Sequence, residues 1–208
     1  FVSHRAVDHP ESITLNDFLN EIRSDRHVDK VARIRAEPDR EKRAKLKASL
    51  PVVTLSGVCG EGRGGSNSVT EPSGLLQLDF DEVGNLFDAM ETLRSDPHIV
   101  SVFRSPSRNG IKAIALGDPS DHAGCFRAAE KYFGELSLRP DPQTKSLKSL
   151  CYLSHDPDAW AAPHPAEPLQ PIPEETSLRC ATSAIDDDMY GGPFIWGNNG
   201  PTGLSQVW

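Results

Sequence analysis

Residues 75–85 read LLQLDFDEVGN, an apolar run that ends in two aspartates, Asp79 and Asp81. The apolar residues predict a β-strand, and residues i and i+2 of a strand point to the same face of the sheet. The two carboxylates would then lie side by side, where like charges repel unless a cation or a shared proton lies between them. A divalent metal is therefore the first hypothesis. The alternative is that one carboxylate caps the following turn or helix while the other is solvated.

Downstream of this stretch, the pattern predicts a helix, a hairpin, a second helix and a last strand. Residues 85–95 carry apolar side chains at helical spacing. Two apolar runs, 99–103 and 110–116, are separated by the polar loop RSPSRN, which is typical of an antiparallel hairpin. We expect the second helix to begin at about residue 120 and the last strand to cover residues 149–154.

Upstream, the chain is predicted to be helical and then to form strands. Thr14 is placed to cap a first helix, with Asp17 in the capping-box position. The basic residues 30–47 predict a second helix that is interrupted near Pro38, and residues 51–58 read as a strand. The whole order predicts an α+β fold, a mostly antiparallel sheet with helices packed on one side.

Three segments are expected along the chain. Residues 1–47 form an N-terminal helical segment, residues 48–162 form the core, and residues 163–208 form a Pro/Gly-rich arm or linker. Because the chain begins with Phe1 and not with Met, we expect it to be an excerpt of a longer protein.

Composition limits the functional classes. There is no run of about 18 apolar residues and no signal peptide, so a soluble cytoplasmic protein without a membrane partner is expected. The four scattered cysteines form no C-x-x-C pair, which favours buried free thiols over a zinc site or disulfides. The net charge of −8 argues against a nucleic-acid partner, but residues 1–50 hold eleven Lys/Arg against nine Asp/Glu. A basic helix there could meet phosphates, although such a run is more often a solvated face.

Further chemistry-bearing residues follow the two aspartates. The hairpin loop and the strand after it gather hydroxyls, a glycine backbone and two cations, and another carboxylate, Asp141, stands before Lys148 and the last strand. Three carboxylates suit two hard divalent cations, Mg²⁺ or Mn²⁺, that leave positions open for substrate phosphates. Hydroxyls, backbone amides and cations would neutralise a triphosphate. The loop candidates for this role are Ser105, Ser107, Arg108 and Lys112. Together these residues predict nucleotidyl transfer.

The order of these motifs resembles the archaeo-eukaryotic primase superfamily, the primase-polymerases. D-h-D after an apolar strand, S-x-S-x-x-G-h-[H/K] in a hairpin, and an Asp before a basic residue and an apolar strand have counterparts there in the same order. The chain is most similar to the small primase-like domains found ahead of helicases in plasmid, phage and mobile-element replication proteins. The resemblance covers roughly residues 48–160.

This resemblance implies an RRM-like catalytic core and a DNA-directed nucleotidyltransferase that acts in replication or repair priming. It also implies a two-metal site with Mg²⁺ or Mn²⁺, a single-stranded DNA template or primer, dNTP or NTP substrates, and a helicase domain C-terminal to it in the full-length protein. Carried over by position, the metal ligands are Asp79, Asp81 and Asp141, and the nucleotide contacts are Ser105 or Ser107, Arg108, Lys112 and Lys148. Lys112 departs from the family, most of which has histidine there; lysine keeps the charge but loses the defined geometry of the imidazole.

Two other functions stay open. Residues 79–83 also fit D-x-D-x-[TV] of haloacid-dehalogenase-like phosphatases, in which the first Asp is a nucleophile, and residues 117–121 mimic the later G-D-x-x-D of that family. Only about 35 residues separate the two motifs, too few for the β-α units of a doubly wound sheet. The other alternative is a non-catalytic nucleic-acid-binding module, although Phe80 is the only aromatic residue of its strand.

Overall fold

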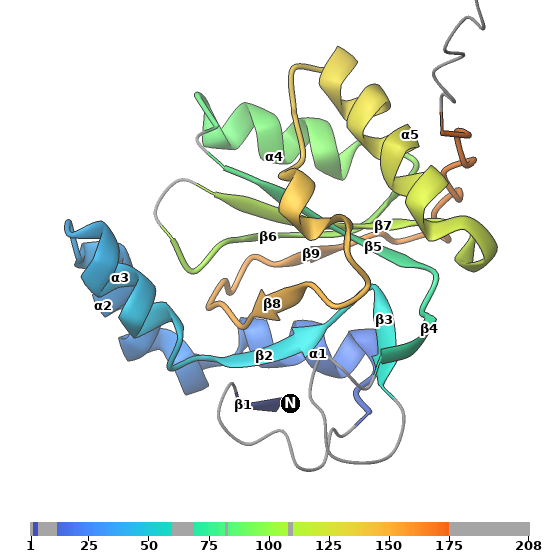
Figure 1. The fold of residues 1–208 in the computed structure, drawn as a ribbon. Coiled ribbons are helices and arrows are strands. Elements are labelled where there is room, and N and C mark those ends of the chain that lie inside the picture. The colour runs from blue at the N-terminus through green and yellow to red at the C-terminus, as the bar shows by residue number, and fades with distance from the viewer. Residues whose placement is uncertain (1, 4–11, 60–68, 82, 108–109, 175–208) are drawn as a thin grey trace, which may run out of the picture. The chain divides into compact units, whose positions relative to one another are not determined.

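A computed structural model describes residues 2–3, 12–59, 69–81, 83–107 and 110–174 (Figure 1). All of these lie in the first of two units into which the chain divides, residues 1–174. The described residues contain five α-helices and antiparallel sheets, so the predicted α+β class is confirmed. No helix in this part of the chain is both long and apolar enough to cross a membrane.

The N-terminal helices begin and end where local signals place them. The hydroxyl oxygen of Thr14 accepts the N–H of Asp17 at 3.1 Å, which caps the first helix as predicted. The basic segment is broken around Pro38, and the side chain of Asp39 caps the helix that follows by accepting the N–H of Lys42 at 2.9 Å. The three helices are α1 (Leu15–Arg23), α2 (Val28–Ala36) and α3 (Arg40–Lys47).

The central sheet has four strands in the order β5-β7-β6-β9, and every neighbouring pair is antiparallel. The predicted hairpin is present as β6 and β7. In the register of β5 against β7, Asp79 lies directly opposite Lys112. The strands are β5 (Leu75–Phe80), β6 (Ile99–Arg104), β7 (Ile111–Leu116) and β9 (Trp160–Ala161).

Helices cover both faces of this sheet, not one as the sequence suggested. Alternate residues of β5, such as Leu78, pack against α4 (Leu86–Arg94) and α5 (His122–Glu135) in one core cluster. On the opposite face, Phe103 and Ile114 pack against the apolar stripe of α1, and the rings of Phe18 and Phe103 meet edge to face. The sequence shows that α1 must bury its stripe, but the periodicity of one helix does not say which surface receives it.

A smaller sheet faces the same side as α1 (Figure 1). It has the order β1-β2-β8, formed by β1 (Val2–Ser3), β2 (Pro51–Thr54) and β8 (Leu150–Tyr152). The single strand expected over 51–58 is in fact two, because β3 (Gly57–Cys59) turns away to pair with β4 (Val69–Pro72). Ser56 directs this turn: its hydroxyl oxygen accepts the N–H of Gln77 at 3.1 Å, and its carbonyl accepts the N–H of Ser73 at 3.0 Å.

The first part of the proline-rich segment, residues 163–174, is fixed to the sheet and to α5. The N–H of Leu169 donates to the carbonyl of Leu116 at 2.9 Å, and the Leu169 side chain is buried in the same core cluster as α4 and α5. The N–H of Ile172 donates to the carbonyl of Gly124 at 3.0 Å. The three segment boundaries remain predictions, and residues 175–208 lie outside the described residues.

Candidate active site

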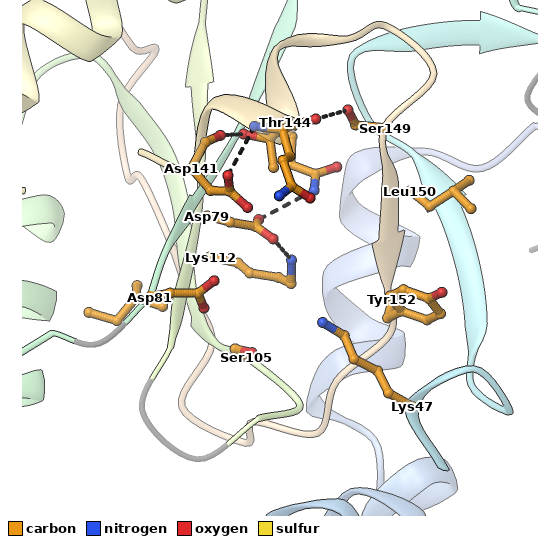
Figure 2. Close-up of a pocket in the computed structure, with 13 residues that line it drawn as sticks. Lys47, Asp79, Asp81, Ser105, Lys112, Asp141, Thr144, Ser149, Leu150 and Tyr152 are labelled. Atoms are coloured by element: carbon orange, nitrogen blue, oxygen red, sulfur yellow. Dashed lines mark hydrogen bonds and ion pairs between the residues drawn. The ribbon is translucent and has the colours of Figure 1, made fainter. Parts of the chain in front are cut away.

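A pocket of about 240 Å³ opens between the end of β5 and the smaller sheet (Figure 2). Five of the eight residues predicted for the site line it: Asp79, Asp81, Ser105, Lys112 and Asp141. They lie at the end of β5, on the two sides of the loop that joins β6 to β7, and in the segment after α5. Three separate parts of the chain therefore bring carboxylates, a hydroxyl and a cation to one place.

Asp141 is held beside Asp79 by the backbone. Its N–H donates to the carbonyl of Asp79 at 2.7 Å, and its own carboxylate accepts the N–H of Gln143 at 2.9 Å, which caps a short 3₁₀ turn (Pro142–Lys145). Thr144 closes the turn by donating its hydroxyl to the carbonyl of Asp141 at 2.7 Å. Because Asp141 Oδ1 serves the cap, Oδ2 is the oxygen left for a ligand.

Asp79 is paired with a buried cation. The Nζ of Lys112 donates to one carboxylate oxygen, and the Nε2 of Gln77 donates to the other at 3.3 Å. Lys112 is only 2% exposed. Burial alone would lower the pKa of Lys112, but the negative charges of Asp79 and Asp81 raise it, and the net shift is upward. Lys112 therefore remains a cation at neutral pH.

Asp81 lies beside the hairpin, next to a glycine. A Cβ atom at Gly110 would stand 3.0 Å from Asp81 Oδ1 and 3.0 Å from the Cβ of Ser105. The absence of a side chain at Gly110 thus leaves the carboxylate and the hydroxyl room on the pocket side. Glycine here provides a close approach.

Of the other three predicted residues, the two that the structure describes, Ser107 and Lys148, do not line the pocket. Ser107 lies two residues further along the loop, and its N–H donates to the hydroxyl oxygen of Ser105 at 3.1 Å. This separates the two serines that the sequence left equivalent: Ser105 is the one that lines the pocket. Lys148 is exposed on the loop before β8, and Arg108 lies outside the described residues. Their contacts with a nucleotide stay predictions.

Lys47 is a site residue that the sequence did not reveal. It is the last residue of α3, and its Nζ lies 5.1 Å from the ring centroid of Tyr152. Figure 2 shows its amine and the carboxylate of Asp81 pointing toward the same space from opposite sides. Burial and then the charge of Lys112 lower the pKa of Lys47. An incoming anion would relieve this repulsion between the two lysines.

Gln77 was missed too, although a signal existed. Gln77 and Asp79 alternate along β5, and Asp81 follows one residue after its end. All three are polar, so the same two-residue periodicity that pairs the aspartates also places Gln77 in the pocket. The side chain is 1% exposed, and its Oε1 finds no hydrogen-bond partner among the described residues. A buried acceptor without a donor is costly and calls for a ligand group or an ion.

The donor set fits a hard divalent cation that arrives with its substrate. The free groups are all oxygens: Asp81, Asp141 Oδ2 and the Gln77 amide oxygen, with Asp79 beside them. Within the described residues no three Asp, Glu, His or Cys side chains are close enough to form a ready-made metal group. Mg²⁺ in particular is usually held by one or two carboxylates plus substrate phosphates and waters. The pocket matches that mode better than a closed protein cage.

The free-thiol prediction is confirmed for Cys125 and Cys151, both buried. Cys151 lies on β8 behind the pocket, and burial raises the pKa of its thiol to about 11.

In the native protein we expect iodoacetamide to leave Cys151 unmodified at neutral pH, since the thiolate is the reactive form. Peptide mass spectrometry with and without urea measures this; rapid labelling of Cys151 without denaturant would contradict its placement.

Comparison with known proteins identifies the family. No curated protein and no solved structure gives a significant match to the chain. The family model described as BT4734-like, N-terminal domain matches residues 45–160, a range that starts within α3, ends in β9 and contains every residue that lines the pocket. The match covers more than half of the 208 residues. The chain therefore belongs to the BT4734-like, N-terminal domain family.

Proposed function

We propose that this domain is a metal-dependent nucleotidyltransferase of the primase-polymerase type, which adds nucleotides under the direction of a single-stranded DNA template. One observation carries the proposal: Asp79, Asp81 and Asp141 line a single pocket together with the cation Lys112. The three carboxylates carry one more negative charge than Lys112 and Lys47 together balance. They are useful where metal ions and polyphosphate enter together.

We assign metal binding to some residues of the pocket and phosphate binding to others. Asp79, Asp81 and Asp141 would hold Mg²⁺ or Mn²⁺. When bound, these ions stabilise the charge of the attacking and leaving oxygens in a phosphoryl displacement. Lys112 and Lys47 provide positive charge for the β- and γ-phosphates, and the hydroxyl of Ser105 donates to a phosphate oxygen. Ser107, Arg108 and Lys148 belong to the same proposal as further phosphate contacts.

The geometry disfavours the phosphatase alternative. Asp118 follows β7 at the end where the N–H of Gly117 donates to the carbonyl of Gly74, just before β5. Asp79 lies at the opposite end of β5, roughly 16 Å away at about 3.3 Å per residue. Asp118 and Asp121 instead cap the 3₁₀ turn before α5 and α5 itself. The two motifs that a phosphatase joins in one site are therefore apart.

The experiment is template-directed incorporation. Wild-type protein is incubated with single-stranded DNA, with and without a primer, labelled dNTPs or NTPs, and Mn²⁺ or Mg²⁺; Asp79→Ala/Asp81→Ala is the control. We expect metal-dependent products from the wild type alone. A folded wild-type protein that makes no product under any of these conditions would refute catalysis and favour a non-catalytic nucleic-acid-binding module. Turnover of a generic phosphomonoester that disappears in Asp79→Asn would favour the phosphatase.

Lys47→Gln is expected to raise KM for the nucleotide about tenfold and to change kcat less than about twofold, because one charge-assisted hydrogen bond to phosphate is worth about that much. Lys45→Gln is the matched control, since Lys45 is exposed on the same helix and does not line the pocket. Initial rates at varied nucleotide concentration measure both constants. An equal effect of the two substitutions would show that only the overall charge of α3 matters.

A further inference from the structure

A second hollow lies at the β6–β9 edge of the central sheet, outside the pocket described above. It has a volume of about 650 Å³ and is formed by the ends of α1, α4, β6 and β9. We name it the arginine groove after three of its residues. Its principal side chains are Arg23, Arg94, Arg104, Phe87, Met90 and Trp160.

The charge of the arginine groove favours an anionic ligand. Arg104 is exposed at the end of β6. Arg23 and Arg94 are oriented by backbone carbonyls, since Arg23 Nε donates to Ala159 at 2.9 Å and Arg94 Nη2 donates to Asp158 at 3.3 Å. Two guanidinium groups are thus held in place by neutral partners, although Arg94 also pairs with Glu91 on its own helix. Held guanidinium groups are well suited to phosphate.

Two aspartates, Asp156 and Asp158, line the groove beside the three arginines. Asp156 is only 3% exposed, and its carboxylate accepts the N–H of Arg104 at 2.7 Å and the N–H of Asp158 at 3.2 Å. Its role is to close the turn at Pro157 and to hold the end of β6. Asp158 is the exposed carboxylate on the groove wall. With three arginines and two aspartates, the groove lining carries one more positive than negative charge, and Arg104 is its exposed cation.

Two aromatic side chains add flat apolar surface. Phe87 is 71% exposed in the first turn of α4, far more than the other exposed large hydrophobic residues described, of which Leu136 is next at 43%. Trp160 is half-buried on β9 and packs against the core cluster of α4 and α5, which fixes the orientation of its ring. An exposed ring and a fixed ring between cations form a surface on which bases can stack.

We propose that the arginine groove binds single-stranded nucleic acid, with bases on Phe87 and Trp160 and phosphates on the arginines. The inference rests on the proposed function in one respect, namely that the bound strand is the template. The hairpin links the two sites in sequence, since Arg104 lines the groove and the next residue, Ser105, lines the pocket, while α4 of the groove covers the sheet face opposite to the one on which Asp79 and Lys112 lie.

The test uses the whole chain and a fluorescein-labelled dT20 oligonucleotide, with binding followed by anisotropy at two salt concentrations. Phe87→Ala and Arg104→Ala are each expected to weaken binding about tenfold. Arg104→Ala is also expected to reduce the slope of log affinity against log salt by about one. The matched controls are Leu136→Ala, an exposed apolar residue of the α5 end, and Lys131→Ala, an exposed cation of α5; each should change binding less than about twofold.

Either groove variant binding dT20 as tightly as the wild type would overturn the inference and point to a protein partner on this face. A wild-type protein that does not bind dT20 at low salt would overturn it as well. Failure of the proposed function looks different: tight, groove-dependent binding without nucleotide incorporation would leave the groove assignment standing and remove the polymerase. Nucleotide incorporation that neither groove substitution changes would support the polymerase and remove the groove as its template site. Thermal melting of Phe87→Ala, a change at an exposed side chain, checks that the variant is folded.

Discussion

Asp81→Asn and Asp141→Asn are each expected to lower the rate of nucleotide incorporation at least roughly 100-fold, the loss typical when one charge-stabilising group is taken from a reaction centre. Asparagine keeps the size of the side chain and removes its negative charge. At position 141 it also keeps an oxygen that accepts the N–H of Gln143, so the turn after α5 survives the change. The loss would therefore report on charge at the pocket and not on folding.

Initial rates over a range of Mn²⁺ concentrations measure this prediction. Glu135→Gln is the control, because it removes one exposed carboxylate from the end of α5, away from the pocket. We expect unfolding temperatures of the two pocket variants to equal or exceed that of the wild type, since fewer like charges are held together. An Asp81→Asn protein with more than half of the wild-type rate would contradict the assignment of this carboxylate.

Lys112→Met is expected to lower the free energy of unfolding by about 3 kcal/mol, because it leaves the Asp79 carboxylate without its cation. The side chains of Lys112 and Asp79 are 3% and 18% exposed, so solvent screens the pair only in part, and the expected cost lies at the lower end of the range for broken buried pairs. Urea unfolding with linear extrapolation measures the change.

The double variant Lys112→Met/Asp79→Asn separates the ion pair from the packing of the lysine stem. We expect it to be more stable than Lys112→Met alone, since the uncompensated charge is gone. A double variant that is equally or less stable would assign the loss to packing.

The pKa of Lys112 is raised above its ordinary value of 10.5, so the contribution of the pair is fully present below that pH. It is lost only as pH rises through the higher pKa of the folded state, so the cost of Lys112→Met should be constant across the neutral range.

Local signals in the sequence predicted the elements well. The Thr14 cap, the break at Pro38 and the hairpin loop each act within a few residues of the chain, and each is present in the structure. Gly57 is an example of a position that local signals do not explain. A Cβ there would stand 2.6 Å from the carbonyl oxygen of Leu147, a contact between distant segments that no local pattern reveals. The end of β2 and the turn into β3 depend on such distant contacts, including those of Ser56 with Ser73 and Gln77.

The sequence predicted those site residues whose positions follow from strand periodicity or from the order of the motifs. It did not predict contacts that depend on tertiary packing. The pairing of Asp79 with Lys112 follows from the register of β5 on β7, which no spacing in the sequence specifies. Lys47 reaches the pocket only because α3 ends beside β2 and places that one lysine of a basic run over Tyr152. Asp141 was expected from motif order, but its closeness to Asp79 depends on a backbone hydrogen bond between distant segments.

The arginine groove was invisible to the sequence for the same reason. The strand that carries the aspartates has Phe80 as its one aromatic residue, and Phe80 is buried at 1% exposure. The two aromatic residues that line the groove, Phe87 and Trp160, lie far apart in the sequence, and both reach this hollow because β9 pairs with β6 next to α4. No periodic pattern in the sequence predicts a surface that is built from four elements, α1, α4, β6 and β9.

The most direct measurement is Mn²⁺ binding in the presence of a nucleoside triphosphate, followed by the electron paramagnetic resonance signal of free Mn²⁺. Wild-type protein is compared with Asp81→Asn/Asp141→Asn, which leaves the pair of Asp79 and Lys112 intact. We expect the wild type to reduce the free signal when nucleotide is present, and the double variant to reduce it at least roughly tenfold less at equal concentration. Equal reduction by the two proteins, or none by the wild type, would contradict a metal–nucleotide site at these carboxylates.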